Sequence, residues 1–305
     1  MQSQYIQARK SHLNFYRAVP LFYQHNGKDF ILYKPAGLKL SEMRIKDERY
    51  PESLYLRRND KLRGIQEVQK EFNQQLKIDI QSNNAINVKN TLVNIVQETF
   101  SEPRSGSIEG ISETVDILIG DFAKESEVLK NLLRVSNKDY TTVLHSINVM
   151  ALAIGYAQNE NFSTSEKRKI GLCALLHDVG KTKINSEILQ APRKLNDEEF
   201  KKMKSHTIYG YEILNKCKIF SDDIKLTALQ HHEKLDGSGY PQNITEVSRM
   251  AQIIGLIDCY EALTNDDRPY RDSMAPLKAL TLIKDDVVAG KYSRRVFEKF
   301  AYSLL

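Results

Sequence analysis

GLCALLHDVGK, residues 171–181, is an apolar run that ends in a histidine–aspartate pair and a glycine. Apolar residues without strand-like alternation, closed by Gly180, are typical of a buried helix that stops just after the pair. His177 and Asp178 are adjacent, and adjacent helical side chains point about 100° apart, so both can reach one metal ion held between helices. Asp178 can also bridge two ions, because each of its carboxylate oxygens can bind one. The stretch therefore predicts a helical domain built around a metal centre.

Helical patterns continue on both sides of this stretch. Apolar residues at helical spacing predict helices over about 66–76, 88–100, 111–134, 139–157, 165–179, 197–215, 222–232, 247–265 and 275–288. Asp139, Ser165 and Asn196 are expected N-caps, the last with Glu199 three residues later. Breaker-rich residues 101–110 predict a loop.

The first sixty residues follow another pattern. Short aromatic-rich runs at 19–23, 30–33 and 53–56 are separated by turn signals, and Asn26-Gly27 between the first two is a hairpin signature. We therefore expect a mainly α protein with a small β-rich regulatory domain at 1–60. A helical connector at 61–134 and an all-α bundle at 135–305 complete the expected division.

Composition sets further bounds. The 305 residues are 41% hydrophobic and 27% charged, as in soluble globular proteins, and the length suggests two domains. No apolar stretch is long enough to cross a bilayer, and the N-terminus has no signal-peptide core, so a cytoplasmic location is expected. Three cysteines without a C-x-x-C pair argue against disulfides and a thiolate zinc site. The net charge of +5 is spread along the chain, which does not favour a nucleic-acid polymer as partner.

Five of the seven histidines lie between residues 145 and 232. Alone, His145 is better explained as a buried core histidine, and His206 as a helix-surface residue. Asp258 lies inside an apolar helix, where an unpaired carboxylate is costly, so we expect a cation as its partner. Imidazoles and carboxylates without thiolates suit iron, manganese or zinc better than magnesium or calcium. The candidate set also contains His177, Asp178, His231 and His232.

Two motifs identify a family. HDVGK at 177–181 and HHEKLDGSGYP at 231–241 together resemble the HD-GYP family, a branch of the HD phosphohydrolases, over about residues 135–290. Asp258 and the stretch YEALT at 260–264, leading to RPYR at 268–271, add a third matching block. Members of this family hydrolyse cyclic di-GMP, a bacterial second messenger, to linear pGpG and in some cases on to GMP. The resemblance implies an HD-type helical bundle with the same activity.

The resemblance also implies the ligands of the metal centre. Asp178 would bridge two ions, a hydroxide held between those ions would attack phosphorus, and Lys181 would be the second catalytic residue. One ion would be bound by His145, His177 and Asp258, and the other by His206, His231 and His232. Some members bind a third ion through a glutamate one turn before the first histidine. That position is Thr141 here, so two divalent ions are expected, most simply iron, with manganese as the alternative.

Substrate contacts are implied as well. Lys181, Tyr240, Arg268 and Arg271 would hold the phosphates or a guanine base, although residues 265–267 are one longer than the usual spacing, which leaves the register of Arg268 open. The loop that borders the cleft in the family, and that docks partner proteins there, matches Asp236, Gly237, Gly239, Tyr240 and Pro241. Each of these residues also has a plain structural explanation, such as Asp236 bracing a tight turn.

The leading hypothesis is a bacterial cyclic di-GMP phosphodiesterase. One alternative is a cyclic-dinucleotide receptor that signals through the N-terminal domain, and another is an HD phosphohydrolase acting on a different cyclic dinucleotide or nucleotide. Residues 29–41 are similar to a small β-rich domain that often precedes HD-GYP domains, for which a regulatory or oligomerisation role is expected. A protein partner at the 236–241 loop and a homodimer are further expectations, whereas a membrane is not.

Overall fold

The computed structural model describes residues 4–27, 29–43, 51–82, 84–122, 141–265 and 273–305. It separates into two compact units, residues 1–75 and 76–305, which are treated in turn. Among the described residues, no helix has both the length and the apolar character needed to cross a membrane.

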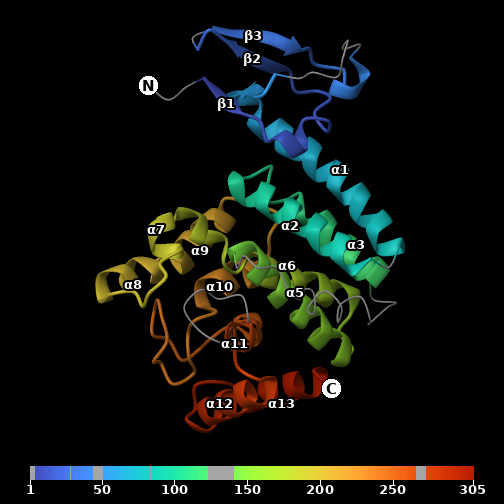
Figure 1. Ribbon diagram of the computed structural model, residues 1–305. Helices are drawn as coiled ribbons and strands as arrows, with labels where there is room; N and C mark the ends of the chain where they lie inside the picture. Colours follow the sequence, from blue (N-terminus) through green and yellow to red (C-terminus); the bar gives the residue numbers. More distant parts are fainter. Residues whose placement is uncertain (1–3, 28, 44–50, 83, 123–140, 266–272) are drawn as a thin grey trace. The chain divides into compact units, whose positions relative to one another are not determined.

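The first unit contains a small antiparallel sheet (Figure 1). Its strands are β1 (Tyr5–Gln7), β2 (Leu21–His25), β3 (Asp29–Lys34) and β4 (Tyr55–Arg57), in the order β1-β4-β2-β3. Short 3-10 turns lie at Lys10–His12, Leu40–Glu42 and Arg58–Asp60. The expected hairpin is present: β2 pairs with β3, and Asn26 and Gly27 in the turn have φ of 48° and 70°. Asparagine and glycine are the residues that best tolerate this left-handed region. Strand β1 was not expected, since three residues are too few to show an alternation.

A buried lysine braces this sheet at its end. Lys34, the last residue of β3, is fully buried, and its Nζ donates to the carbonyl oxygens of Arg17 at 3.3 Å, Pro35 at 3.0 Å and Leu38 at 2.9 Å. An ammonium group has three N–H donors and no acceptor. Three carbonyl oxygens therefore satisfy it within the chain.

Helices make up the rest of the molecule (Figure 1). They are α1 (Lys61–Gln81), α2 (Ala85–Ser101), α3 (Ile111–Phe122), α5 (Thr142–Asn159), α6 (Thr164–Leu176), α7 (Ser186–Leu189), α8 (Asp197–Lys204), α9 (His206–Asn215), α10 (Asp222–Gln230), α11 (Arg249–Thr264), α12 (Pro276–Val288) and α13 (Arg294–Ser303). A 3-10 segment, η5 (Val179–Lys183), follows α6. In the second unit α5 packs against α6 and α11, and α10 packs against α6, α9 and α11. The predicted class, mainly α with a small β-rich N-terminal part, is confirmed.

Some expected helix ends are wrong. The cap of α6 is Ser163, not Ser165: the Ser163 Oγ accepts from the backbone N–H of Glu166, whose carboxylate accepts from Ser163 N–H. The predicted helix 197–215 is two helices, because Ser205 donates its N–H to Lys202 in a tight turn between α8 and α9. The Asn196 capping box is confirmed.

Other boundaries fall in loops or outside the described residues. Residues 102–110 form the expected loop after α2. The helices predicted over 165–179 and 222–232 end earlier, at Leu176 and Gln230. Asp139 and residues 123–134 lie outside the described part of the chain.

Candidate metal centre

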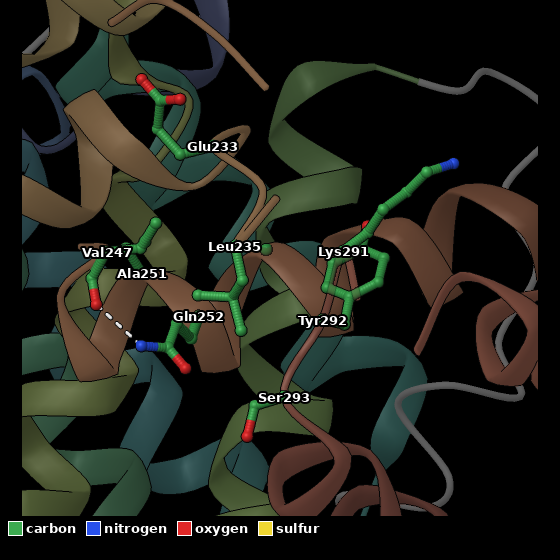
Figure 2. Close-up of a pocket in the computed structure, with 9 residues that line it drawn as sticks. Glu233, Leu235, Val247, Ala251, Gln252, Lys291, Tyr292 and Ser293 are labelled. Atoms are coloured by element: carbon green, nitrogen blue, oxygen red, sulfur yellow. Dashed lines mark hydrogen bonds between the residues drawn. The ribbon is translucent and has the colours of Figure 1, made fainter. Parts of the chain in front are cut away.

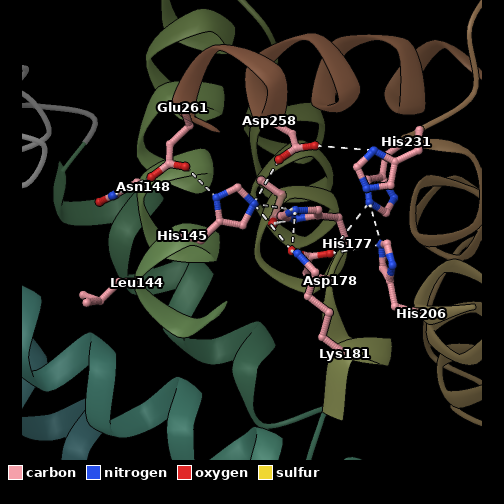
Figure 3. A network of polar contacts seen from close by, with 12 residues as sticks. Leu144, His145, Asn148, His177, Asp178, Lys181, His206, His231, Asp258 and Glu261 are labelled. Atoms are coloured by element: carbon pink, nitrogen blue, oxygen red, sulfur yellow. Dashed lines mark hydrogen bonds and ion pairs between the residues drawn. The ribbon is translucent and has the colours of Figure 1, made fainter. Parts of the chain in front are cut away.

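The seven expected ligands come together in the second unit, mostly at helix ends (Figure 3). His177 follows the last residue of α6, His206 begins α9, and His231 follows α10. His145 lies in the first turn of α5, and Asp258 lies within α11. Asp178 and His232 follow their neighbours His177 and His231. All are buried except His232, which is partly exposed.

Two glycines allow the close approaches that assemble this site. A Cβ atom on Gly180 would lie 1.9 Å from the carbonyl oxygen of His206, so only glycine lets η5 pack directly on the start of α9. A Cβ on Gly255 would lie 2.2 Å from the carbonyl oxygen of His231, so α11 also touches the end of α10 through a glycine. Side chains from segments far apart in the sequence are thereby brought around Asp178.

Asp178 divides its two oxygens between two groups of histidines. Its Oδ2 lies 3.5 Å from His145 Nε2 and 3.4 Å from His177 Nε2. Its Oδ1 lies 3.3 Å from His206 Nε2 and 3.8 Å from His231 Nε2. The potential ligand atoms of His145, His177 and Asp178 lie within 4.8 Å of one another, as do those of His206, His231 and His232. One carboxylate oxygen thus faces each of two candidate ion positions.

Asp258 lies near a histidine of each group. Its Oδ1 is 3.0 Å from His145 Nε2, and its Oδ2 is 3.8 Å from His232 Nδ1. The sequence assigned Asp258 to the ion bound by His145 and His177, and the shorter of these two distances lies on that side.

Backbone carbonyls set the tautomers of several histidines. The Nδ1 atoms of His177, His206 and His231 lie 2.6, 2.7 and 3.0 Å from the carbonyl oxygens of Ala174, Met203 and Thr227. A carbonyl only accepts hydrogen bonds, so Nδ1 carries the proton and Nε2 keeps its lone pair. Each of these Nε2 atoms then faces Asp178 as a ready metal ligand.

The donor set fits divalent metal ions. The Nε2 atoms of His206 and His231 lie only 3.3 Å apart with their lone pairs turned to the same space, which is favourable only with a cation between them. The buried Asp178 Oδ1 accepts no hydrogen bond from any residue that the structure describes. Buried carboxylates are normally paired or hydrogen-bonded. Imidazole nitrogens and carboxylate oxygens suit iron, manganese or zinc.

The charges at the site are set by burial and by close neighbours. Burial lowers the pKa of His206 to about 4 and that of His231 to about 3, so both are neutral near pH 7. Burial also lowers the pKa of His145, but the nearby carboxylates of Glu261 and Asp258 outweigh it and raise that pKa to about 9. Burial by itself raises the pKa of Asp178, yet Lys181 and the surrounding histidines hold it well below its ordinary value.

Comparisons with known proteins agree with this geometry. Residues 126–296, more than half of the chain, match the model of a family described as HD domain. The chain belongs to the HD domain family. Within it, recognition of the HD-GYP branch from the two sequence motifs is confirmed. HD domain phosphohydrolases use divalent metals, which is consistent with the two groups of donors around Asp178.

Curated relatives share the HD domain region. The chain is 32% identical over 191 residues to the cyclic di-GMP phosphodiesterase PA4108 of Pseudomonas aeruginosa, covering 62% of this chain and 45% of the relative. It is 34% identical over 155 residues to the 3'3'-cGAMP-specific phosphodiesterase 3 of Vibrio cholerae, covering 50% of this chain and 33% of the relative. The chain thus spans less than half of the length of either relative.

One solved structure resembles the chain along almost its full length. Bd1817, a HDG"Y"P protein from Bdellovibrio bacteriovorus, aligns with a TM-score of 0.64 and 19% identity, covering 98% of this chain and 99% of that one. At this identity the likeness shows a common fold.

Two further predicted site residues, Lys181 and Tyr240, lie beside the Asp178–histidine site of this HD domain. Lys181 Nζ donates to the Oδ2 of Asp178. The Tyr240 ring lies 4.7 Å from the His232 ring, and Lys204 Nζ lies 5.2 Å from the centre of the Tyr240 ring. The Asp236 Oδ1 accepts from the N–H and the hydroxyl of Ser238 at 2.9 and 2.7 Å. Asp236 therefore braces the loop, and Tyr240 lies against the centre.

The other predicted site residues are three members of the loop, Gly237, Gly239 and Pro241, and two arginines, Arg268 and Arg271. Gly237 has a φ of 78°, which suits a glycine in the turn, while Gly239 is buried and Pro241 follows Tyr240 through a cis peptide bond. Arg268 and Arg271 lie outside the described residues, so their register is not tested.

Two buried glutamates in the HD domain were missed by the sequence analysis. Glu261 Oε2 lies 2.6 Å from His145 Nδ1, and Figure 3 shows the two side chains pointing toward each other. Glu233 accepts from the N–H groups of Gln242 and Ile244, at 2.6 and 3.3 Å, and so ties the end of the loop back to its start. Their positions, one helical turn after Asp258 and directly after His232, are the signal that could have found them.

A separate, small pocket lies elsewhere in the second unit (Figure 2). Its described lining residues include Glu233, Gln252 and Tyr292, and Gln252 Nε2 donates to the carbonyl of Val247 at 2.7 Å. None of the seven expected metal ligands lines it among the described residues. This pocket is therefore distinct from the place where the histidines and Asp178 converge.

Proposed function

We propose that this chain is a metal-dependent phosphodiesterase that hydrolyses cyclic di-GMP to pGpG, with GMP as a later product. The observation that carries the proposal is Asp178, whose two oxygens each face a separate group of histidines. Two divalent ions, iron or alternatively manganese, would be held by His145, His177, Asp178, His206, His231, His232 and Asp258. When bound, such ions supply Lewis acidity, which activates water and offsets phosphate charge.

The chain's own groups would orient the substrate. The Lys181 ammonium lies at the same carboxylate that faces both ion positions, so it is placed to neutralise a non-bridging phosphate oxygen. Tyr240 lies against the rings of the second histidine group and offers a flat face to a base. Arg268 and Arg271 are proposed as further phosphate or guanine contacts on the basis of their motif.

Two ions, not three, are proposed because of Thr141. Its Oγ accepts from the backbone N–H of Leu144 at 3.3 Å and so caps α5. Where relatives of this family can place a glutamate for a third ion, this chain has a short hydroxyl that serves as a helix cap. Elemental analysis of anaerobically purified protein should therefore give two ions per chain, and three would contradict the proposal.

Activity is tested with purified, metal-loaded protein. Protein loaded with Fe²⁺ or Mn²⁺ is incubated with cyclic di-GMP, and the products are separated by chromatography. Formation of pGpG is the expected result. Tight binding without turnover under both metals would instead indicate a cyclic-dinucleotide receptor.

A second candidate substrate follows from the comparisons. One of the two reported relatives is named for cyclic di-GMP and the other for 3'3'-cGAMP. Both molecules are cyclic dinucleotides with the same kind of phosphodiester bond. Competition between them in one reaction, compared by the ratio of kcat/KM values, decides which is the substrate.

The remaining parts of the chain are proposed to regulate this activity. Residues 1–60 would form a regulatory domain and 61–134 a helical connector to the catalytic part at 135–305. The 236–241 loop is proposed as a docking site for a protein partner, and a homodimer as the state in solution. Light scattering of the full chain, with and without cyclic di-GMP, tests the dimer.

A further inference from the structure

The Nδ1 atom of His145 has a different kind of partner from those of the other three buried histidines of the centre. His177, His206 and His231 each point Nδ1 at a neutral backbone carbonyl three or four residues earlier in the chain. His145 instead points Nδ1 at the carboxylate of Glu261, at 2.6 Å. This is the one charged Nδ1 partner among these four histidines in the described contacts.

Glu261 is held in place by neutral donors. Its Oε1 accepts from Asn148 Nδ2 at 2.9 Å and from Asn265 Nδ2 at 2.6 Å, and Figure 3 shows Asn148 directed toward it. The other oxygen, Oε2, is thereby directed at His145. The glutamate is 3% exposed, so the interaction takes place away from water.

Two helices each supply two residues to this arrangement. Helix α5 supplies His145 and, three residues later, Asn148, while α11 supplies Asp258 and, three residues later, Glu261. Residues three apart on a helix lie on the same face. Each helix thus carries one predicted ligand and one supporting residue, and Figure 3 shows Asn148 and Glu261 on the side of the His145 ring away from Asp178.

A buried carboxylate acts on a ligating histidine more strongly than a carbonyl does. A partner that accepts the Nδ1 proton fixes the ring and increases the basicity of Nε2, and a negative charge in a low-dielectric site does so most strongly. The His145 side of the centre also has Asp258 Oδ1 at 3.0 Å, whereas the nearest Asp258 oxygen to His232 Nδ1 lies at 3.8 Å. Negative charge is therefore concentrated on one of the two ion positions.

We infer that Glu261 is a positioning residue that makes the two metal positions unequal, so that the position built on His145 binds its ion more tightly than the position built on His206, His231 and His232. This inference rests on the binuclear centre of the proposed function. The first ion to enter would occupy the His145 position, and the second would be the exchangeable one.

Glu261→Gln tests the inference with little change in size. Asn148 and Asn265 both donate toward Oε1, so a glutamine would present its oxygen to them and its NH₂ group to His145. An NH₂ group donates, which forces Nδ1 of His145 to accept and leaves the proton on Nε2, the atom needed for the metal. The variant should therefore weaken the tighter position specifically.

The measurement is a Mn²⁺ titration of the metal-free full chain, with free Mn²⁺ counted by electron paramagnetic resonance. Wild-type protein should show two steps at least tenfold apart. In Glu261→Gln the tighter step should weaken by about 10- to 100-fold while the other stays within threefold. The matched control is Asp286→Asn, which removes a surface carboxylate paired with Lys291 and should leave both steps unchanged.

Equal weakening of both steps, no weakening of either, or two equal steps in the wild type would overturn the inference. Should Glu261→Gln not fold, Asn148→Ala decides, because it removes a donor to Glu261 without changing a ligand. It should weaken the tighter step by less than tenfold and spare the other. Mn²⁺ binding is measured without substrate, so the two proposals can fail separately. If Glu261→Gln does not weaken the tighter step selectively while the wild type still hydrolyses cyclic di-GMP, only the role of Glu261 is wrong. If the variant weakens only the tighter Mn²⁺-binding step but the wild type does not hydrolyse cyclic di-GMP, only the proposed substrate is wrong.

Discussion

Lys34 and Asp178 are both fully buried charged residues, but the chain treats them in opposite ways. In the first unit, the Lys34 ammonium donates to three carbonyl oxygens and is complete within the protein. In the second unit, Asp178 has one oxygen paired with Lys181 and another that accepts no hydrogen bond from the described residues. The Lys34 charge therefore needs nothing beyond the chain, whereas the free oxygen of Asp178, which faces imidazole nitrogens, is consistent with a place for a cation.

The largest expected effect comes from removing Asp178. Asp178→Ala deletes the oxygen that faces each histidine group, so most bound metal and at least about a thousandfold of the hydrolysis rate should be lost, roughly 4 kcal/mol in the activation barrier. Elemental analysis and product chromatography measure both. Asp222→Ala, an exposed aspartate on α10, is the control. Unchanged metal content in Asp178→Ala would refute the bridging role.

Lys34→Met should lower the stability of the chain without changing its bound metal. Three carbonyl oxygens would lose the hydrogen bonds that the buried ammonium donates, which should lower the free energy of unfolding by about 3 kcal/mol. Urea unfolding of the full chain followed by circular dichroism measures the change. Metal content should stay the same, and Lys10→Met at an exposed position should have no effect. A drop in bound metal for Lys34→Met would contradict the purely structural role of Lys34.

Lys181→Met separates metal binding from substrate chemistry. The ammonium is placed to neutralise phosphate charge, so its loss should lower kcat by about 10- to 100-fold, roughly 1.4 to 2.7 kcal/mol. Bound metal should remain, because Asp178 still faces both histidine groups. Lys183→Met, on the same 3-10 segment with an exposed side chain, is the matched control. If the two variants have equal activity, Lys181 has no catalytic role.

The smallest expected effect is at Thr141. Thr141→Ala removes the cap of α5 and should cost about 1 kcal/mol, or a few degrees in Tm. Thr141→Ser keeps the hydroxyl and should retain wild-type stability. Both variants should bind the same number of ions as the wild type. A lower metal content in Thr141→Ala, measured by elemental analysis, would show that this hydroxyl contributes to the centre after all.

Features governed by neighbours in sequence were predicted well. The Asn26-Gly27 hairpin and the Asn196 capping box depend on residues a few positions apart, and both are present. The error at Ser165 has the same origin: two serines lie close to the start of α6, and only the chain's path selects Ser163. The break at Ser205 has no local breaker residue to announce it.

The sequence by itself determined the fold class and named the residues gathered at the centre, through the family resemblance that HDVGK and HHEKLDGSGYP carry. Their roles as ligands stay a prediction. Only the tertiary structure decided how Asp178 divides its oxygens and which partner each histidine has. Glu261 and His145 are 116 residues apart, and no local pattern joins them. They meet because α11 packs against α5, and the distance and direction of that contact depend on how side chains fit between helices.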